Sequence, residues 1–211
     1  TLDVNELLML LDRARHTEYG VPIYIAAHTG MRKGEVAGLQ WRDINFADMV
    51  ISVRRELIFV PGKGYVVTPP KSAKGRRAVD VSSSVVAELQ KHRASQAELR
   101  LRTGAGWRDE GWVFTKNDGS HLNPTAITRA FATIRDGLGL SSVRLHDLRH
   151  THATLLLEAG VHLKVVQERL GHATIGITAD TYSHVAPGLQ KEAVRKFEER
   201  IQIGKEVAVD A

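Results

Sequence analysis

The sequence predicts a mainly α-helical fold with one small antiparallel β-sheet, an α+β architecture. Two observations carry that prediction. Apolar residues recur at three- and four-residue spacing before residue 41 and again from residue 82 onward, which is the period of helices with one buried face. Between residues 49 and 81 the pattern changes to short alternating runs of β-branched residues, which is typical of strands. Two helical regions therefore flank one short β-region.

The N-terminal region predicts three helices. They are expected over residues 3–16, 22–30 and 34–40. Thr1 or Asp3 is a suitable cap for the first, because both side chains accept hydrogen bonds from backbone N–H groups. Gly30 is expected to stop the second, since glycine adopts the left-handed conformation at a helix end. Arg32 would then lie at a junction between two helices.

The β-region predicts four strands of one antiparallel sheet. They are expected over residues 50–53, 57–60, 65–67 and 78–81. A turn at 61–64 contains Pro61 and two glycines and should join the second strand to the third. Between the last two strands lies a basic segment, 70–77, with two lysines and two arginines. By itself, such a charge run is most simply a solvated loop.

Helical periodicity then continues to the C-terminal region. A long helix over 82–102 should begin at a serine cap, and a short extended segment at 112–114 and a turn at 117–119 should follow it. The remaining predicted helices span residues 124–136, 147–158, 163–170, 175–182 and 188–199. Glycine or proline separates most of them, so their bounds are locally defined.

Length and composition fit a globular protein of one domain or two small ones. The chain has 211 residues, 43% of them hydrophobic, and a net charge of +5, which favours a polyanionic partner. It has no cysteine, which excludes a disulfide framework, a thiol nucleophile and cysteine-ligated zinc. No long apolar run or signal-like start is present, so we expect a cytoplasmic protein with no membrane partner.

Five reactive side chains stand in short motifs along the chain. They are Arg32 in Thr-Gly-Met-Arg-Lys-Gly-Glu, His146 and Arg149 in Leu-His-Asp-Leu-Arg-His, His172 in Arg-Leu-Gly-His, and Tyr182 in Asp-Thr-Tyr-Ser-His. Two planar, permanently charged arginines can clamp the oxygens of one phosphate. A tyrosine hydroxyl can attack phosphorus and keep it as an ester. Together these residue types indicate a site for a phosphodiester.

Each motif also has a simpler interpretation when taken alone. His146 could cap a helix while Arg149 pairs with a surface carboxylate, and Tyr182 could be a buried core tyrosine. His146 and His150 have the spacing of a helical zinc pair, but no acidic third ligand is evident, so His150 and His152 are interpreted as packing residues. Glu35 and Asp147 are expected to hold a neighbouring arginine or a helix end in place.

In this order and spacing, the motifs resemble the catalytic domain of the tyrosine recombinases, the phage integrase family, over residues 1 to about 185. The resemblance implies the tyrosine recombinase catalytic-domain fold. It implies site-specific recombination of double-stranded DNA, the integration or excision of a phage or mobile element, by cleavage and rejoining through a covalent 3′-phosphotyrosyl intermediate. It also implies that neither metal, ATP nor another cofactor is required.

The resemblance gives each motif residue a role. Tyr182 is the expected nucleophile and His146 the expected proton acceptor. Arg32 and Arg149 would bind the non-bridging oxygens, and His172 would donate a hydrogen bond to one of them. A lysine of the basic segment is expected to protonate the leaving 5′ oxygen. We assign it to Lys71 and not to Lys74, because Pro-Lys-Ser before the strand matches the family better.

The resemblance also sets expectations for the whole protein. Residues 1–211 would be its C-terminal catalytic domain, preceded by a core-binding domain and often an arm-binding domain. The full-length protein would assemble as a homotetramer on its DNA sites, with possible accessory DNA-bending or directionality proteins. The last helix has an apolar face that would pack on a neighbouring protomer or, alternatively, on its own domain: Leu189, Ala193, Val194 and Phe197.

Three other functions stay open on sequence grounds. A type IB topoisomerase uses a similar set of residues to relax supercoils, but the Leu-Gly-His and Asp-Thr-Tyr-Ser-His-Val motifs are more similar to those of integrases. A catalytically silent DNA-binding module is disfavoured because binding alone does not need a tyrosine in this setting. A histidine–metal hydrolase has only His146 and His150 in its favour.

Overall fold

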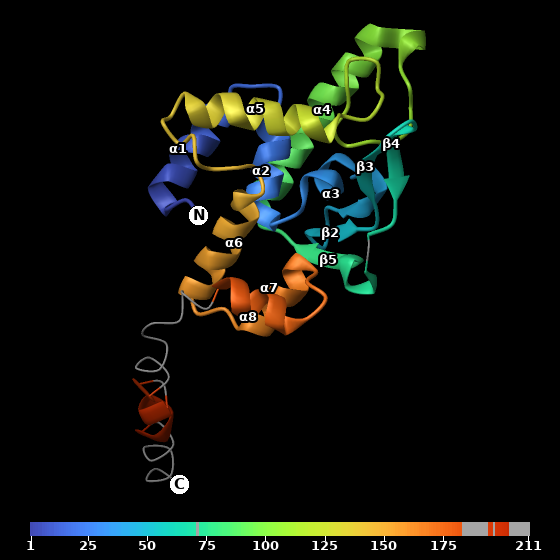
Figure 1. The fold of residues 1–211 in the computed structure, drawn as a ribbon. Helices are drawn as coiled ribbons and strands as arrows, with labels where there is room; N and C mark the ends of the chain where they lie inside the picture. The colour runs from blue at the N-terminus through green and yellow to red at the C-terminus, as the bar shows by residue number, and fades with distance from the viewer. Residues whose placement is uncertain (71, 183–193, 196, 203–211) are drawn as a thin grey trace.

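The computed structural model describes residues 1–70, 72–182, 194–195 and 197–202, and at 73, 177 and 180–182 it describes the backbone alone. Figure 1 shows helices α1, α2 and α5 grouped together, with the strands on one side of them. Helix α6 runs from this group toward α7 and α8, which lie next to each other beyond β5. The expected mainly α-helical α+β fold is confirmed.

The three predicted N-terminal helices are present. Helix α1 spans Val4–Ala14 and is capped by Asp3, whose carboxylate accepts a 2.8 Å hydrogen bond from the backbone N–H of Glu6. Helix α2 spans Gly20–Thr29 and is largely buried. Helix α3 is shorter than expected, Lys33–Ala37, because Gly38 caps it and Gln40 forms an isolated β-bridge with Trp112.

The strands form two sheets instead of the single sheet expected. Strands β1 (Ile44–Asn45), β2 (Val50–Val53) and β5 (Arg77–Asp80) form an antiparallel sheet in the order β1-β2-β5. Strands β3 (Glu56–Val60) and β4 (Gly64–Thr68) pair with each other as a separate hairpin. The chain turns between β2 and β3, where the Arg55 guanidinium is fixed by hydrogen bonds to the Asp43 carboxylate and the Gly38 carbonyl.

The later helices have the predicted bounds, with α4 shifted by one residue. Helix α4 spans Ser83–Thr103, and the others span Pro124–Asp136 (α5), Asp147–Glu158 (α6), Leu163–Leu170 (α7) and Ile175–Tyr182 (α8). Of the predicted helix 188–199, the structure describes 194–195 and 197–199, which are helical. Leu189 and Ala193 of its expected apolar face lie outside the described residues, and Val194 and Phe197 are exposed.

Apolar packing divides between a main core and a smaller one. The main core contains residues from helices α1 through α5, from the strands and from the start of α6. Phe114 and Phe131 are among its largest side chains. The smaller core holds Ala153 and Leu157 of α6 against Val166 and Leu170 of α7. The smaller core fixes α7 against α6 and so positions the residues that follow α7. None of the described helices is both long and apolar enough to cross a membrane.

Candidate active site

The guanidinium of Arg149 joins two segments that are far apart in the sequence. Arg149 lies in the first turn of α6 and only 3% of it is exposed. Its Nη1 donates to the carbonyl oxygen of Gly30 at 2.7 Å, and its Nη2 donates to that of Leu170 at 2.6 Å. Arg32 follows Gly30 by two residues, and His172 follows Leu170 by two. Arg149 therefore brings the segments of Arg32 and His172 together from a buried position, not from the surface.

Two glycines allow close packing around these segments. Gly30 ends α2 and Gly171 ends α7, and both have a positive φ, +65° and +69°. A Cβ atom at Gly30 would lie 2.7 Å from the side chain of Leu170, and one at Gly171 would lie 2.9 Å from the carbonyl oxygen of Lys74. A side chain at either position would be strained. At Gly30 it would push the Leu170 segment away, and at Gly171 it would push away the basic segment 70–77.

The buried carboxylate of Glu35 holds Arg32 in place. Arg32 Nη1 donates to Glu35 Oε1 at 3.0 Å, and the Arg32 backbone N–H donates to Oε2 at 2.8 Å. Arg77 also donates to both oxygens, at 3.1 and 3.0 Å. Burial raises the pKa of Glu35, but the bonds and charges of Arg77 and Arg32 outweigh it and lower the pKa. Glu35 thus holds Arg32 as an ionised carboxylate, in the positioning role expected for it.

Two further arginines tie the site to the sheet and to α2. Arg77 Nε donates to the carbonyl oxygen of Arg169 at 2.6 Å. The Arg169 guanidinium donates in turn to the carbonyl oxygens of Asp80 and His28, at 2.8 and 3.1 Å, and to Nε2 of His152 at 2.9 Å. The sequence does not predict these roles: Arg77 lies in the basic segment, of which a lysine alone is given a role, and Arg169 is given none.

His146 precedes α6 and its side chain makes no capping hydrogen bond. Its ring stands edge-on to that of His150, with centroids 5.1 Å apart. Burial lowers the pKa of His146, as do the charges of His150, Arg149 and Arg32, against the opposing charge of Asp147. His146 is therefore neutral at neutral pH and is able to accept a proton.

Asp147 and His152 are structural, as expected. Asp147 accepts a 2.8 Å bond from the backbone N–H of Arg144 and a 3.1 Å bond from the Arg144 guanidinium, so it fixes the start of α6. Burial and the neighbouring Arg169 lower the pKa of His152 to about 3. His152 consequently stays neutral and packs as an acceptor for Arg169.

His172 is fixed at both its main chain and its ring. Its backbone N–H donates to the Gln167 carbonyl at 3.1 Å, and Gln167 Nε2 donates back to the His172 carbonyl at 2.5 Å. The ring atom Nδ1 lies 2.9 Å from Thr178 Oγ1. Burial lowers the pKa of His172 to about 4, together with the charges of Arg149 and Arg32. The same two arginines therefore act on both His146 and His172.

Two predicted site residues lie wholly or partly outside the described residues. Lys71 is not described, and for Tyr182 the backbone alone is described, as the last residue of α8. The alternative lysine, Lys74, donates from Nζ to the carbonyl oxygen of Ala173 at 2.7 Å. Lys74 therefore binds the backbone next to His172.

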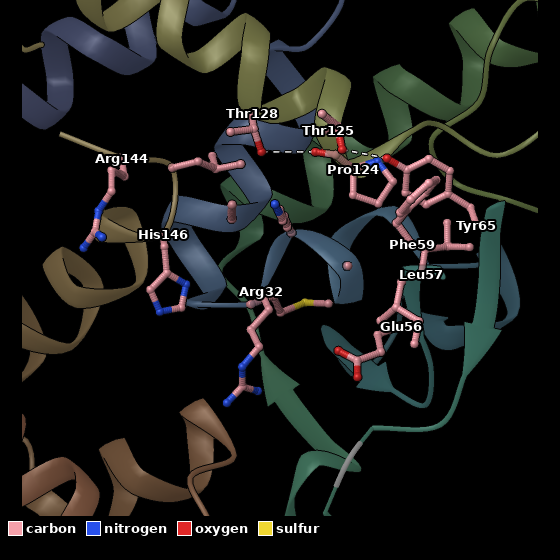
Figure 2. A pocket seen from close by; sticks show the side chains of 16 residues that line it. Arg32, Glu56, Leu57, Phe59, Tyr65, Pro124, Thr125, Thr128, Arg144 and His146 are labelled. Atoms are coloured by element: carbon pink, nitrogen blue, oxygen red, sulfur yellow. Dashed lines mark hydrogen bonds between the residues drawn. The ribbon is translucent and has the colours of Figure 1, made fainter. Parts of the chain in front are cut away.

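Arg32 and His146 lie at the same end of a cavity of about 590 Å³ (Figure 2). Its other walls are largely apolar and include Leu57, Phe59 and Tyr65 of the β3–β4 hairpin. A second cavity of about 170 Å³ adjoins Arg32 and Glu35. The neighbours of residue 71, Pro70 and Ser72, line that second cavity, so the basic segment borders Arg32.

No three histidine, aspartate or glutamate side chains gather closely enough to hold a metal ion in the part of the chain that the structure describes.

The chain is similar in sequence to known proteins. The sequence profile of the phage integrase family matches residues 1–188. A XerC-like tyrosine recombinase of Caldanaerobacter subterraneus is 35% identical over 181 residues, which cover 81% of this chain and 46% of that protein. The ICEBs1 integrase of Bacillus subtilis is 31% identical, over 83% of this chain and 47% of that protein. The chain thus spans about half the length of these relatives.

Solved structures show the same fold. The Tn1549 transposon integrase, in complex with transposon right end DNA, superposes with a TM-score of 0.76 at 23% identity, over 95% of this chain and 65% of that one. The XerA recombinase superposes with a TM-score of 0.69 at 24% identity, over 92% and 64%. With the family profile matched over nearly the whole length, the chain belongs to the phage integrase family.

Proposed function

We propose that this chain is the catalytic domain of a site-specific tyrosine recombinase, which cleaves and rejoins double-stranded DNA. One observation carries the proposal: Arg149 binds the backbone of both the Arg32 and the His172 segments. Two arginines, Arg32 and Arg149, therefore lie close enough to two neutral histidines, His146 and His172, to lower the pKa of both. The names of the relatives, tyrosine recombinase and integrase, support the same activity.

The proposed reaction is a transesterification at phosphorus. The Tyr182 hydroxyl attacks the scissile phosphate, the bond to the 5′ oxygen breaks, and a 3′-phosphotyrosyl ester forms. The phenol has an ordinary pKa of about 10, so it must lose its proton during the attack, and neutral His146 accepts it. Because the ester is retained, a 5′ hydroxyl of another strand reverses the step without ATP.

The positive groups of the site stabilise the charge that develops on the phosphate. Arg32 and Arg149 neutralise the non-bridging oxygens, and His172 donates a hydrogen bond to one of them. Lys71 protonates the departing 5′ oxygen, and the position of Pro70 and Ser72 beside the Arg32 cavity supports that role. These protein groups supply the charge and the protons, so the proposed reaction needs no cofactor.

The proposed partner is double-stranded DNA that carries recombination sites. The net charge of +5 suits a polyanion, and the similar Tn1549 integrase was solved in complex with DNA. A tetramer of the full-length protein on DNA, packing through the C-terminal helix, belongs to the same proposal. So do preceding DNA-binding domains, accessory DNA-bending or directionality proteins, and a cytoplasmic location.

Capture of the covalent intermediate tests the proposal. With a nicked suicide duplex, the chain should form a denaturant-stable adduct with the 3′-phosphate side of the cut strand, and chelator should not prevent it. Tyr182→Phe should bind the duplex and form no adduct, whereas Tyr19→Phe, which alters a tyrosine away from the site, should behave as wild type. An adduct with Tyr182→Phe, or a strict need for a divalent ion, would overturn the proposal.

A further inference from the structure

The hydroxyl of Thr178 forms a hydrogen bond with the ring of His172. Thr178 lies in the middle of α8, is completely buried, and places Oγ1 2.9 Å from His172 Nδ1. His172 lies in the loop that follows α7, whereas Thr178 belongs to the next helix, α8. This bond therefore links the ring of a site histidine to the helix that ends at Tyr182.

The bond bears on which nitrogen of the ring carries the hydrogen. A neutral imidazole has one N–H and one acceptor nitrogen, and the partner of one nitrogen fixes the state of the other. A threonine hydroxyl that donates to Nδ1 leaves the hydrogen on Nε2. His172 is neutral at neutral pH, so the tautomer decides whether Nε2 is a donor or an acceptor.

We propose that Thr178 is a positioning residue, which donates to Nδ1 of His172 and holds its Nε2 as the hydrogen-bond donor to the scissile phosphate. The inference rests on the proposed recombinase function. Positions 178 and 182 are four apart in one helix and share a face. When α8, which ends at Tyr182, packs in place, Thr178 therefore also sets His172 Nε2 as a hydrogen-bond donor to the phosphate. Without Thr178, His172 exchanges between tautomers, and one of them presents a lone pair to an anionic oxygen.

The first experiment reads the tautomer without DNA or activity. In protein labelled with ¹⁵N in its ten histidines, couplings between ring nitrogens and carbon-bound ring hydrogens distinguish the two neutral tautomers. The His172 signals are those lost in His172→Gln. Wild type and Thr178→Ser should show the hydrogen on Nε2, and Thr178→Val should show a mixture or the Nδ1 form. Hydrogen on Nδ1 in wild type, or an unchanged tautomer in Thr178→Val, would overturn the inference.

The second experiment measures cleavage of the nicked suicide duplex at saturating DNA. Thr178→Val should slow adduct formation by about tenfold to a hundredfold, with unchanged DNA affinity, and Thr178→Ser should restore most of the rate. In a His172→Gln background the same valine change should have little further effect, because Thr178 acts through His172. Thr133→Val is the matched control: its hydroxyl also lies within a helix, where it bonds the Arg129 carbonyl.

The outcomes separate this inference from the proposed function. A locked tautomer in a protein that never forms an adduct would leave the Thr178–His172 bond intact and remove the recombinase proposal. Normal cleavage by Thr178→Val would contradict the positioning role and leave the recombinase proposal intact. If Thr178→Val slowed cleavage as much in the His172→Gln background as in wild type, the positioning role would also be contradicted, because Thr178 would then not act through His172. If Thr178→Val does not fold, the wild-type tautomer and the serine variant still decide.

Discussion

The Nη1 atom of Arg149 lies 2.7 Å from the carbonyl oxygen of Gly30, a residue 119 positions earlier in the chain. This bond ties the first turn of α6 to the end of α2. A residue proposed to bind phosphate thus also organises the backbone around the phosphate. Loss of its guanidinium should therefore affect folding as well as chemistry.

Replacement of Arg149 by lysine should lower both stability and activity. One ammonium group cannot donate in a fork to two carbonyls on separate segments, so at least one buried carbonyl loses its partner. We expect the free energy of unfolding to fall by about 2 kcal/mol and cleavage by at least about a hundredfold. The control is Arg100→Lys, at an exposed ion pair with Asp109, which should change stability by less than about 0.5 kcal/mol in urea unfolding. Equal losses for both variants would contradict the bridging role.

Removal of the charge at Glu35 should release Arg32. Glu35→Gln keeps the shape of the side chain but leaves Arg32 and Arg77 without their shared carboxylate. We expect a loss of about 3 kcal/mol in the free energy of unfolding, and slower adduct formation at saturating DNA. Glu98→Gln, at an exposed pair with Arg102, should change neither. Full activity of Glu35→Gln would mean that Arg32 does not depend on this carboxylate.

As the pH is lowered, the rate of adduct formation should fall only at pH values below the ordinary pKa of histidine. Protonated His146 cannot accept the tyrosine proton, and burial together with the positive charges of His150, Arg149 and Arg32 lowers its pKa. The rate should therefore be lost only as the pH falls through that lowered pKa. The pH–rate profile of wild type, beside the exposed-histidine variant His16→Gln, measures this. An acid limb at or above about 6.5, the ordinary histidine value, would contradict the assignment.

Stability should decrease as the pH falls below about 6.5. Unfolded histidines take up protons near that value, whereas His172 and His152 keep pKa values of about 4 and about 3 in the folded protein. The unfolded state then binds more protons, so acid favours unfolding down to about pH 4 through His172 and about pH 3 through His152. Urea unfolding at several pH values should show this slope, and His172→Gln should reduce it while His16→Gln should not. An unchanged slope in His172→Gln would contradict the lowered pKa.

The two lysines of the basic segment should respond differently to a sulfur leaving group. If Lys71 is the general acid, Lys71→Ala should slow cleavage of an ordinary 5′ oxygen far more than that of a 5′-phosphorothiolate, whose sulfur leaves without a proton. Lys74 binds the Ala173 carbonyl, so Lys74→Ala should slow both substrates alike. Sulfur rescue of Lys74→Ala in place of Lys71→Ala would move the general acid to Lys74.

Much of the helical structure was predictable because its signals are local. Pro124 starts α5, Gly171 ends α7, and the observed bounds of α5, α6, α7 and α8 equal the predicted ones. The motif residues were also identifiable, since their order and spacing are visible in the sequence. The catalytic roles of the six motif residues stay predictions, and the side chains of Lys71 and Tyr182 also lie outside the described residues.

What the sequence by itself determined was the set of helices, the α+β class and the residues with reactive side chains. The tertiary structure alone decided that the strands divide into two sheets, that Arg77 and Arg169 bind backbone carbonyls, and that Arg149 joins the Gly30 and Leu170 segments. Helix caps and periodicity act over a few residues and leave a pattern in the sequence. A hydrogen bond between an arginine and a carbonyl some 90 to 140 positions away leaves none, because any residue offers that carbonyl and only the fold brings it within reach.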